Sequence, residues 1–262
     1  MRAIRLWIPA ALVAWVGVSL PAAQPGITVP TFGSTPWRTG EPYVVHRAAG
    51  PITIDQTPHP EQWKNTMAVR GFNLAKTTRP AQSRTEAMLL WDDQNLYVQA
   101  VAVDADLRGR FKQRTDPLWE EDVVELFLKP SDSLRIGSGY YEFEINPIGT
   151  VMALKIDDRK DRKSLKERSA WETGIVSAVQ AAGTVNDSSD SDQFYRVILA
   201  VPWKNLSHIR GKAPKVGDTW KFTFCRCDHG KQYKKAEESN SAPMTTDDWH
   251  RFEQYSTLRF GD

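Results

Sequence analysis

Cysteine is scarce in this chain: Cys225 and Cys227 are the only two among 262 residues. They stand two apart in a run typical of a β-strand, so both side chains point to one face and a bond between them would be strained. A fold stapled by disulfides is therefore excluded. We expect two free thiols, one or both of them buried.

An excess of one charge is also lacking, since 34 Lys and Arg balance 32 Asp and Glu to a net charge of +2. This balance gives no reason to expect nucleic acid or an anionic membrane as a partner. The charged run at 157–168 alternates in sign and is expected to be a solvated loop. The sequence contains neither a Gly-rich phosphate loop nor a nucleophile elbow.

The five histidines are scattered without the spacing of a zinc site, so no metal site is expected from them. A three-ligand site of His229 with Cys225 and Cys227 is the alternative. A surface histidine beside two strand thiols is the more common arrangement.

Long apolar runs are rare too, because a single one occurs, from Leu6 to Leu20. Arg2 and Arg5 precede it and small residues follow, which predicts a signal peptide over 1–23 and a secreted or periplasmic protein. An uncleaved anchor is the alternative, although the run is short for a membrane span of ~20 residues. After cleavage no membrane partner is expected. Residues 24–45, rich in Pro, Gly and Thr, are expected to form a linker or N-terminal tail.

Short strands separated by turns dominate the rest of the chain, and helix signals are few. This pattern predicts an all-β fold, an antiparallel β-sandwich of two sheets like an immunoglobulin or jelly-roll domain, over residues 46–262. The expected strands are Thr85 to Trp91, Leu96 to Val103, Val123 to Leu128, Tyr140 to Asn146, Glu172 to Gln180, Phe194 to Val201, Thr219 to Arg226 and Ser256 to Phe260.

Tryptophan is frequent, with ten residues, and Trp119 has the most unusual surroundings. Three acids, Glu120, Glu121 and Asp122, follow it directly, and Glu125 stands in the strand that comes next. A tryptophan that stacks on a polyhydroxylated ring gains from such neighbours, because carboxylates accept hydrogen bonds from hydroxyl groups. Five other tryptophans stand at strand edges in apolar context and are expected in the core: Trp63, Trp91, Trp171, Trp203 and Trp220.

Six motifs in series resemble carbohydrate-binding module family 9, a family of β-sandwich domains related to DOMON domains that includes stand-alone secreted relatives. The resemblance covers about residues 46 to 262. The motifs are Ile52 to Asp55 with Pro60 to Trp63, Leu89 to Val98, Trp119 to Phe127, Tyr140 to Gly149, Val197 to Trp203 after Trp171, and Gly217 to Phe222.

The resemblance implies a site in which two aromatic rings sandwich a sugar, typically at the reducing end of a chain. Trp119 and Trp249 match the two rings, and Glu125, Glu144 and Asn146 match the polar contacts. Glu144 departs from the best-known members, which have arginine there, and Tyr255-Ser256 replaces their usual Phe-Gly. Family members can also hold structural calcium, for which no ligand set can be mapped here.

These observations predict a secreted protein that binds an oligo- or polysaccharide. The expected ligand is a chain end of a plant-type polysaccharide, and the expected role is in carbohydrate catabolism. No catalytic residue is expected, because the acids near Trp119 are adjacent instead of flanking one bond; a glycosidase label could attach by family association.

Two alternatives stay open. One is a haem-binding DOMON-like electron-transfer domain with ligands among Met88, Met152, Met244 and His250. The other is a structural or adhesion domain with a degenerate pocket. The sequence does not indicate the oligomeric state.

Overall fold

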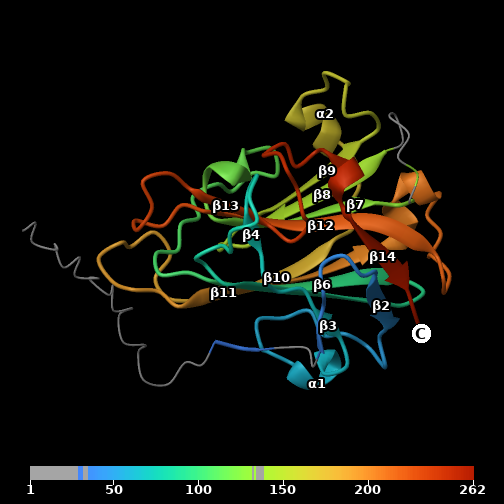
Figure 1. Cartoon of the computed structure of the whole chain (residues 1–262), viewed down its shortest axis with the longest axis horizontal. Helices are drawn as coiled ribbons and strands as arrows, with labels where there is room; N and C mark the ends of the chain where they lie inside the picture. Colours follow the sequence, from blue (N-terminus) through green and yellow to red (C-terminus); the bar gives the residue numbers. More distant parts are fainter. Residues whose placement is uncertain (1–28, 32–34, 132, 134–138) are drawn as a thin grey trace, which may run out of the picture.

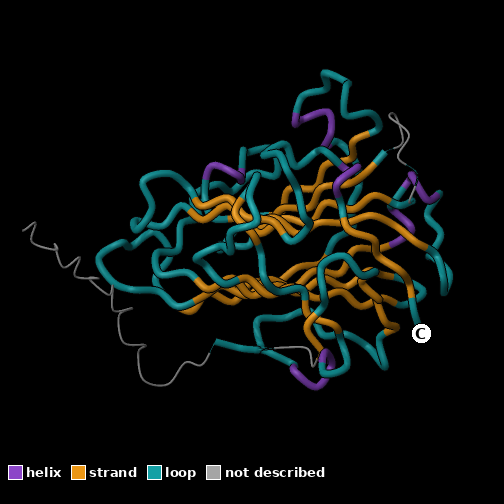
Figure 2. Tube along the Cα trace, in the orientation of Figure 1, coloured by secondary structure: helices purple, strands orange, loops and turns teal. Residues whose placement is uncertain are grey.

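The computed structural model describes residues 29–31, 35–131, 133 and 139–262. Strands fill two stacked layers, and short helices lie at the periphery (Figure 2). The expected β-sandwich is therefore confirmed. The expected signal peptide lies outside the described residues.

The upper layer in Figure 1, called the upper sheet, is built around two long hairpins. Its neighbouring strands pair antiparallel. In spatial order its main strands are β14 (Ser256–Phe260), β12 (Thr219–Asp228), β7 (Val123–Lys129), β8 (Tyr140–Ile145) and β9 (Val151–Ile156); β13 (Glu237–Asn240) also pairs with β12, and β4 (Asn73–Leu74) pairs with β13.

The second layer, called the lower sheet, contains the other long antiparallel strands. In spatial order its strands are β10 (Val176–Ala182), β11 (Phe194–Pro202), β6 (Asn95–Val103), β5 (Thr85–Trp91) and β2 (Tyr43–Arg47). A separate parallel pair of β1 (Thr35–Pro36) and β3 (Met67–Ala68) lies beside it.

Helices are short throughout the described chain. They are α1 (Pro60–Trp63), α2 (Leu165–Ser169) and the 3₁₀ turns η1 (Leu118–Glu120), η2 (Trp203–Asn205), η3 (Ser207–Ile209) and η4 (Phe252–Gln254). The described residues include no helix long and apolar enough to cross a membrane.

The main core lies between the two sheets and follows the two-residue period of the strands. Val124, Leu126 and Leu128 of β7 point into it, as do Tyr141 and Phe143 of β8. Four of the tryptophans expected in the core contact this cluster, and Trp63 is fully buried in a second cluster on the outer face of the lower sheet. The edge-to-face contacts that join Trp203, Trp220 and Phe260 are of the kind that stabilises aromatic cores.

Strand β2 joins the two layers, although most of it was expected to be tail. Residues Tyr43–Val45 pair in parallel with β14 of the upper sheet, and His46 and Arg47 pair in parallel with β5 of the lower sheet. Tyr43 and Val45 are fully buried. The packed fold therefore begins before residue 46, and the expectation of linker or tail up to residue 45 was wrong for this segment. The compositional signal failed because a strand this short shows little periodicity.

Tyr43 gives a test of this link. Its hydroxyl donates to the carbonyl of Met67 at 2.6 Å and accepts from the amide of Leu89 at 3.0 Å. Tyr43→Phe leaves both backbone groups buried without this partner and should lower the free energy of unfolding by about 1–3 kcal/mol. Urea denaturation measures the change.

Tyr195→Phe is the matched control, because Tyr195 is equally buried and its hydroxyl has no hydrogen-bond partner among the described residues. Its stability should stay equal to that of the wild type or rise. Equal losses in both variants would contradict the role assigned to the Tyr43 hydroxyl.

Candidate functional site

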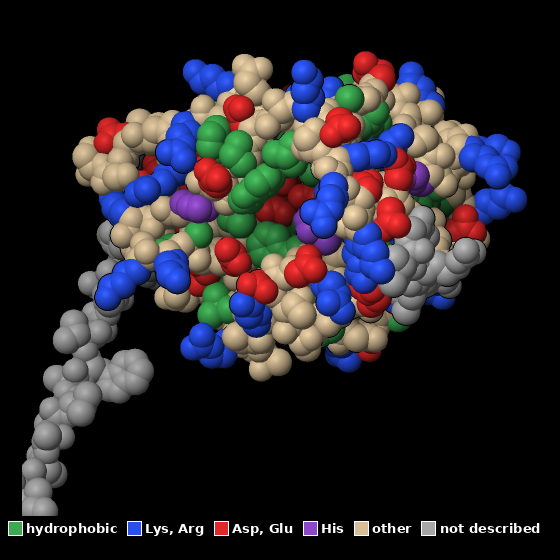
Figure 3. Space-filling view, turned by 90° about the horizontal axis from the view of Figure 1, so that it is seen from above, with side chains coloured by type: hydrophobic (Ala, Val, Ile, Leu, Met, Phe, Trp, Pro, Cys, Tyr) green, Lys and Arg blue, Asp and Glu red, His purple; other side chains and the backbone are tan. Residues whose placement is uncertain are grey.

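A pocket of about 300 Å³ opens on the outer face of the upper sheet. Figure 3 shows this face as a hollow with hydrophobic side chains around it and carboxylates at its base. Fourteen residues line it: Trp119, Glu125, Phe127, Glu142, Glu144, Leu154, Leu165, Arg168, Cys227, Glu238, Asp247, Asp248, Trp249 and His250.

Two indole rings line the pocket. Trp119 stands on η1, and this residue is 39% exposed, more than Trp249. Its carbonyl contacts Nε2 of His229 at 3.0 Å, which fixes the turn. Trp249 comes from the loop before η4 and packs edge-on against Phe127, with 6.4 Å between the ring centroids. The structure thus brings both tryptophans expected from the sequence to one pocket.

Three glutamates form the floor of the pocket. Glu125 of β7 stands directly opposite Glu144 of β8, and Glu142 lies two residues before Glu144 on the same face. Each of the three offers a carboxylate oxygen within 4.8 Å of the other two. Like charges in directly opposed strand positions destabilise a sheet, so this arrangement costs stability as long as the acids are ionised.

The floor is also cut off from water. Glu125, Glu142 and Glu144 are all buried. Burial raises the pKa of Glu125 and of Glu144 well above the usual range, and repulsion from the neighbouring glutamates raises both further. Without a cation nearby, these two carboxyl groups hold their protons more tightly than exposed ones.

The thiols lie beside the same glutamates, on the neighbouring strand β12, where Cys225 stands opposite Glu125. Cys225 and Cys227 are free and buried, as expected, and burial raises the pKa of both. The Cys227 thiol donates to Oε1 of Glu125 over 3.8 Å. The alternative metal site with His229 does not form, because the His229 ring contacts the carbonyl of Trp119.

Several polar atoms at the pocket have no hydrogen-bond partner among the described residues. Both carboxylate oxygens of Glu144 and Oε2 of Glu142 lack a donor, and Nε1 of Trp249 and Nε of Arg168 lack an acceptor. Buried polar atoms are normally paired. Unpaired donors and acceptors in one pocket indicate capacity for a polar ligand.

Asn146, the fifth expected site residue, lies elsewhere. It follows the last residue of β8 and is buried in the turn to β9. Its amide donates to the carbonyl of Phe111 and to Oε1 of Glu121, and its side-chain oxygen accepts from the amide of Thr150. The strand ends before the residue can continue the polar face into the pocket, so these contacts hold the turn.

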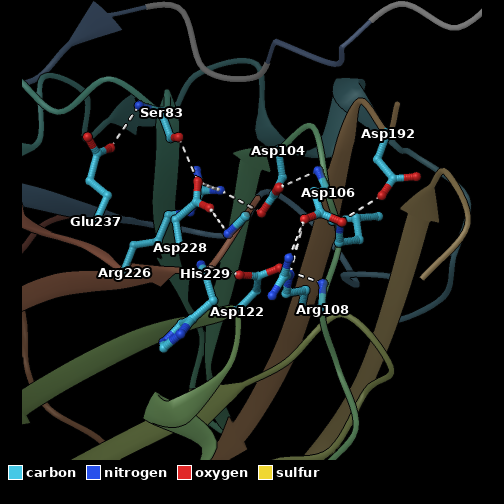
Figure 4. Close-up of polar contacts among 12 residues, drawn as sticks. Ser83, Asp104, Asp106, Arg108, Asp122, Asp192, Arg226, Asp228, His229 and Glu237 are labelled. Atoms are coloured by element: carbon cyan, nitrogen blue, oxygen red, sulfur yellow. Dashed lines mark hydrogen bonds and ion pairs between the residues drawn. The ribbon is translucent and has the colours of Figure 1, made fainter. Parts of the chain in front are cut away.

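A second group of buried acids lies where three strands start or stop, since Asp104 follows β6, Asp122 precedes β7 and Asp228 ends β12 (Figure 4). Asp104, Asp122 and Asp228 approach one another within 4.8 Å. The guanidinium of Arg226 donates to Asp104 and to Asp228, both at 2.9 Å. Burial, together with the neighbouring aspartates, raises the pKa of Asp104 to about 6 and that of Asp122 to about 9.

Carboxylate oxygens suit calcium, which the resemblance implies, so this group is a candidate ligand set. Its oxygens, however, are already paired within the protein: Asp104 accepts from Asp106 N and Arg226, Asp122 from Arg108 N and His229 N, and Asp228 from Gly230 N, Ser83 Oγ and Arg226. This pairing fits a structural clamp that holds loops together, and the calcium ligands stay unassigned.

Sequence reasoning missed part of the pocket. Glu142 shares the face of Glu144 by strand alternation, a signal that could have added it. Arg168 belongs to the run expected to be solvated, yet it lines the pocket while pairing with Asp161 at 2.9 Å. Of the candidate haem ligands, Met152 and Met244 are buried beneath this face, whereas Met88 is buried on the outer face of the lower sheet.

Residues 54–261 match the family described as carbohydrate family 9 binding domain-like. The chain belongs to this family. Two solved structures of a family 9 carbohydrate-binding module from Caldicellulosiruptor kristjanssonii are similar in fold, one in complex with cellotriose and one with glucose. The cellotriose complex gives a TM-score of 0.56 at 18% identity over 83% of this chain and 93% of that one. The glucose complex gives 0.53 at 18% identity, over 84% and 96%.

A curated relative in sequence is endo-1,4-beta-xylanase A of Thermotoga neapolitana, 32% identical over 80 residues. The match covers 30% of this chain and only 7% of the xylanase. A likeness confined to so small a part of the enzyme does not extend its activity to this chain. The family is one of binding modules.

The glutamate floor predicts an unusual pH dependence of stability. A carboxyl group whose pKa is higher in the folded state stabilises the fold at pH values below its unfolded pKa, which for glutamate is near 4.5. This contribution is lost as pH rises toward the folded pKa. Glu144→Gln removes one such group. The variant should therefore gain thermal stability relative to the wild type as pH rises from about 4.5 to neutrality, as measured by melting curves across that range.

Glu41→Gln, an exposed change just before β2, is the control and should melt in parallel with the wild type at every pH. A constant difference between Glu144→Gln and the wild type over the whole range would show that Glu144 is not a strained acid.

Proposed function

We propose that this protein is exported and binds the end of a saccharide chain between Trp119 and Trp249, without a chemical step. The observation that carries the proposal is the convergence of the exposed Trp119 and the partly buried Trp249 on one pocket with a polar floor. Membership of a family of carbohydrate-binding modules supports the ligand class.

Stacking explains the walls of such a site. The C–H face of a sugar ring is apolar. An indole ring can bury ~150–250 Å² of surface, counted over all its contacts with protein and ligand. Trp119 is exposed enough to contact a ligand from solvent, whereas Trp249 is held by its packing on Phe127. Trp249 as the fixed wall and Trp119 as the accessible one can together enclose a flat sugar ring.

Hydrogen bonding explains the floor. Glu142 and Glu144 offer acceptors that have no donor, and Nε1 of Trp249 offers a donor without an acceptor. Hydroxyl groups of a sugar both donate and accept, so they can satisfy both kinds of atom. Pockets of this type orient ligands through a few placed polar groups among apolar walls.

The geometry of the acids argues against hydrolysis. The two carboxyl groups of a glycosidase flank the scissile bond, about 5–5.5 Å or 6.5–9.5 Å apart, from opposite sides of the sugar. Here three carboxyl groups gather within 4.8 Å on one floor. We therefore expect the pure chain to release no reducing sugar from xylan or cellulose.

Export rests on the N-terminal sequence, in which Arg2 and Arg5 precede the apolar run from Leu6 to Leu20. A role in polysaccharide catabolism outside the cytoplasm fits an exported binder of chain ends. N-terminal sequencing of the exported protein should begin near Gln24; intact Met1 in the soluble cytosol would contradict export.

The role of the two tryptophans can be measured directly. Trp119→Ala should weaken oligosaccharide binding by roughly 2 kcal/mol or more, as for other aromatic anchors. It should leave the melting temperature almost unchanged, because the ring is half-exposed. Trp249→Ala should weaken binding similarly, and the two losses should not add, since both rings contact one ligand. Isothermal titration with oligosaccharides and thermal melts provide both readouts.

Trp220→Ala serves as the core control. Its ring is buried against Phe260, so the change should lower stability by ~3–5 kcal/mol. If Trp119→Ala destabilises the protein as much as Trp220→Ala does, Trp119 is a core residue and the proposed stacking site is wrong.

A further inference from the structure

We infer that the pocket selects a saccharide that carries a free amino group, with the ammonium seated on Glu125, Glu142 and Glu144. This inference rests on the proposed function and narrows its ligand class from saccharides in general to amino sugars. The ligand is expected to carry a protonated primary amine on a sugar ring that can stack between Trp119 and Trp249.

The floor glutamates lack the charge partners that other ionised groups of the pocket have. Among the charged residues that line the pocket, Arg168 is already paired with Asp161 at 2.9 Å, and Asp247 is paired with Lys76. The floor glutamates have no comparable partner. The imidazole of His250 lies beside them, with its Nδ1 3.8 Å from Oε2 of Glu142, but this contact is not a hydrogen bond.

The floor also has free hydrogen-bond capacity. Glu144 is fully buried and lines the pocket, and apart from the neighbouring carboxyl group of Glu142 its oxygens have no hydrogen-bond partner among the described residues. The aspartate group around Arg226 shows the contrast within the same molecule, because its oxygens accept from backbone and side-chain donors. The floor therefore has acceptors that the fold itself leaves for a ligand.

The three carboxyl groups match the geometry of an ammonium ion. A protonated primary amine has three N–H donors, and three carboxyl groups converge on the floor. Hydrogen bonds between an ammonium and a carboxylate are about twice as strong as those between neutral groups. Indole rings also attract cations, and two of them line the pocket, so walls and floor favour the same ligand.

A metal ion fits this site less well. Calcium takes 6–8 oxygen ligands, whereas this pocket of about 300 Å³ has two indole walls, a phenyl ring and the Cys227 thiol beside its carboxylates. That volume suits an organic ring. A divalent ion that bridges the floor to sugar hydroxyls is the competing possibility, and it would make binding sensitive to EDTA.

Proton linkage gives an independent signature. Burial raises the pKa of Glu125 and Glu144, so an ammonium ion that binds must displace protons from them. Binding should release protons, which titration in buffers of different ionisation enthalpy detects. Other titratable groups face the floor and stay unchanged in the floor variants compared below: Glu238, Asp247, Asp248, Arg168, His250, Cys225 and Cys227.

The experiment compares three trisaccharides of similar length by isothermal titration of the full chain at mildly acidic pH: β-1,4-linked glucosamine, its N-acetylated form and cellotriose. We expect the glucosamine trimer to bind roughly tenfold or more tightly than the other two, because only it carries amines that pair with carboxylates. Glu144→Gln and Glu142→Gln should each reduce this preference and the proton release. Glu41→Gln should change neither.

The outcomes separate the claims. If cellotriose binds as tightly as the glucosamine trimer, and Trp119→Ala weakens that binding, the amine preference is overturned and the proposed function stands. Binding that EDTA abolishes and calcium restores would overturn it in favour of a bridging metal. Failure of all three sugars to bind the folded wild type would refute the proposed function itself, and the inference with it. If both glutamine variants keep the preference for the glucosamine trimer, the amine binds elsewhere, and the role assigned to the floor glutamates is refuted.

Discussion

The two-residue period of strands β7 and β8 couples the core of this protein to its pocket. Val124 and Leu126 must face the space between the sheets, so Glu125 between them must face the opposite side. The same alternation sends Phe143 inward and Glu144 outward. The apolar core therefore fixes the height and direction of the floor carboxylates. A shift of one residue in register would bury charges in the core, so packing itself preorganises the site.

The two buried acid groups show how differently one fold can treat the same functional group. Around Arg226, charge is offset by a guanidinium and by backbone donors, so each aspartate is satisfied where loops must be joined. On the pocket floor, Glu125 and Glu144 face each other across two strands with no guanidinium between them. Satisfied acids stabilise a structure, whereas unsatisfied acids store a cost that a ligand can relieve. The location of the unsatisfied group is therefore informative about binding.

Much of this arrangement could be predicted from the sequence. Alternation located the strands that carry Glu125 and Glu144, and the unusual acids beside Trp119 pointed to the pocket. Trp249, nearly half the chain away, was placed by the ordered series of family motifs, since no local pattern links it to Trp119. Asn146 shows the limit, because one residue beyond a strand end its side chain turns to the backbone of the next turn. Local periodicity does not fix where a strand stops.

Segments whose role depends on distant contacts could not be predicted. Tyr43 sits in a short strand of a tail-like composition, and only the edges of both sheets make it a strand. Arg168 reaches the pocket because α2 packs on β9 and Asp161 orients the guanidinium. Neither contact leaves a mark within a few residues of either position. The frame of the pocket is thus set by local alternation, and its charge is set by side chains that tertiary packing delivers. Ligand preference can therefore change at the floor, as at Glu144, while the strands and the core that hold it stay the same.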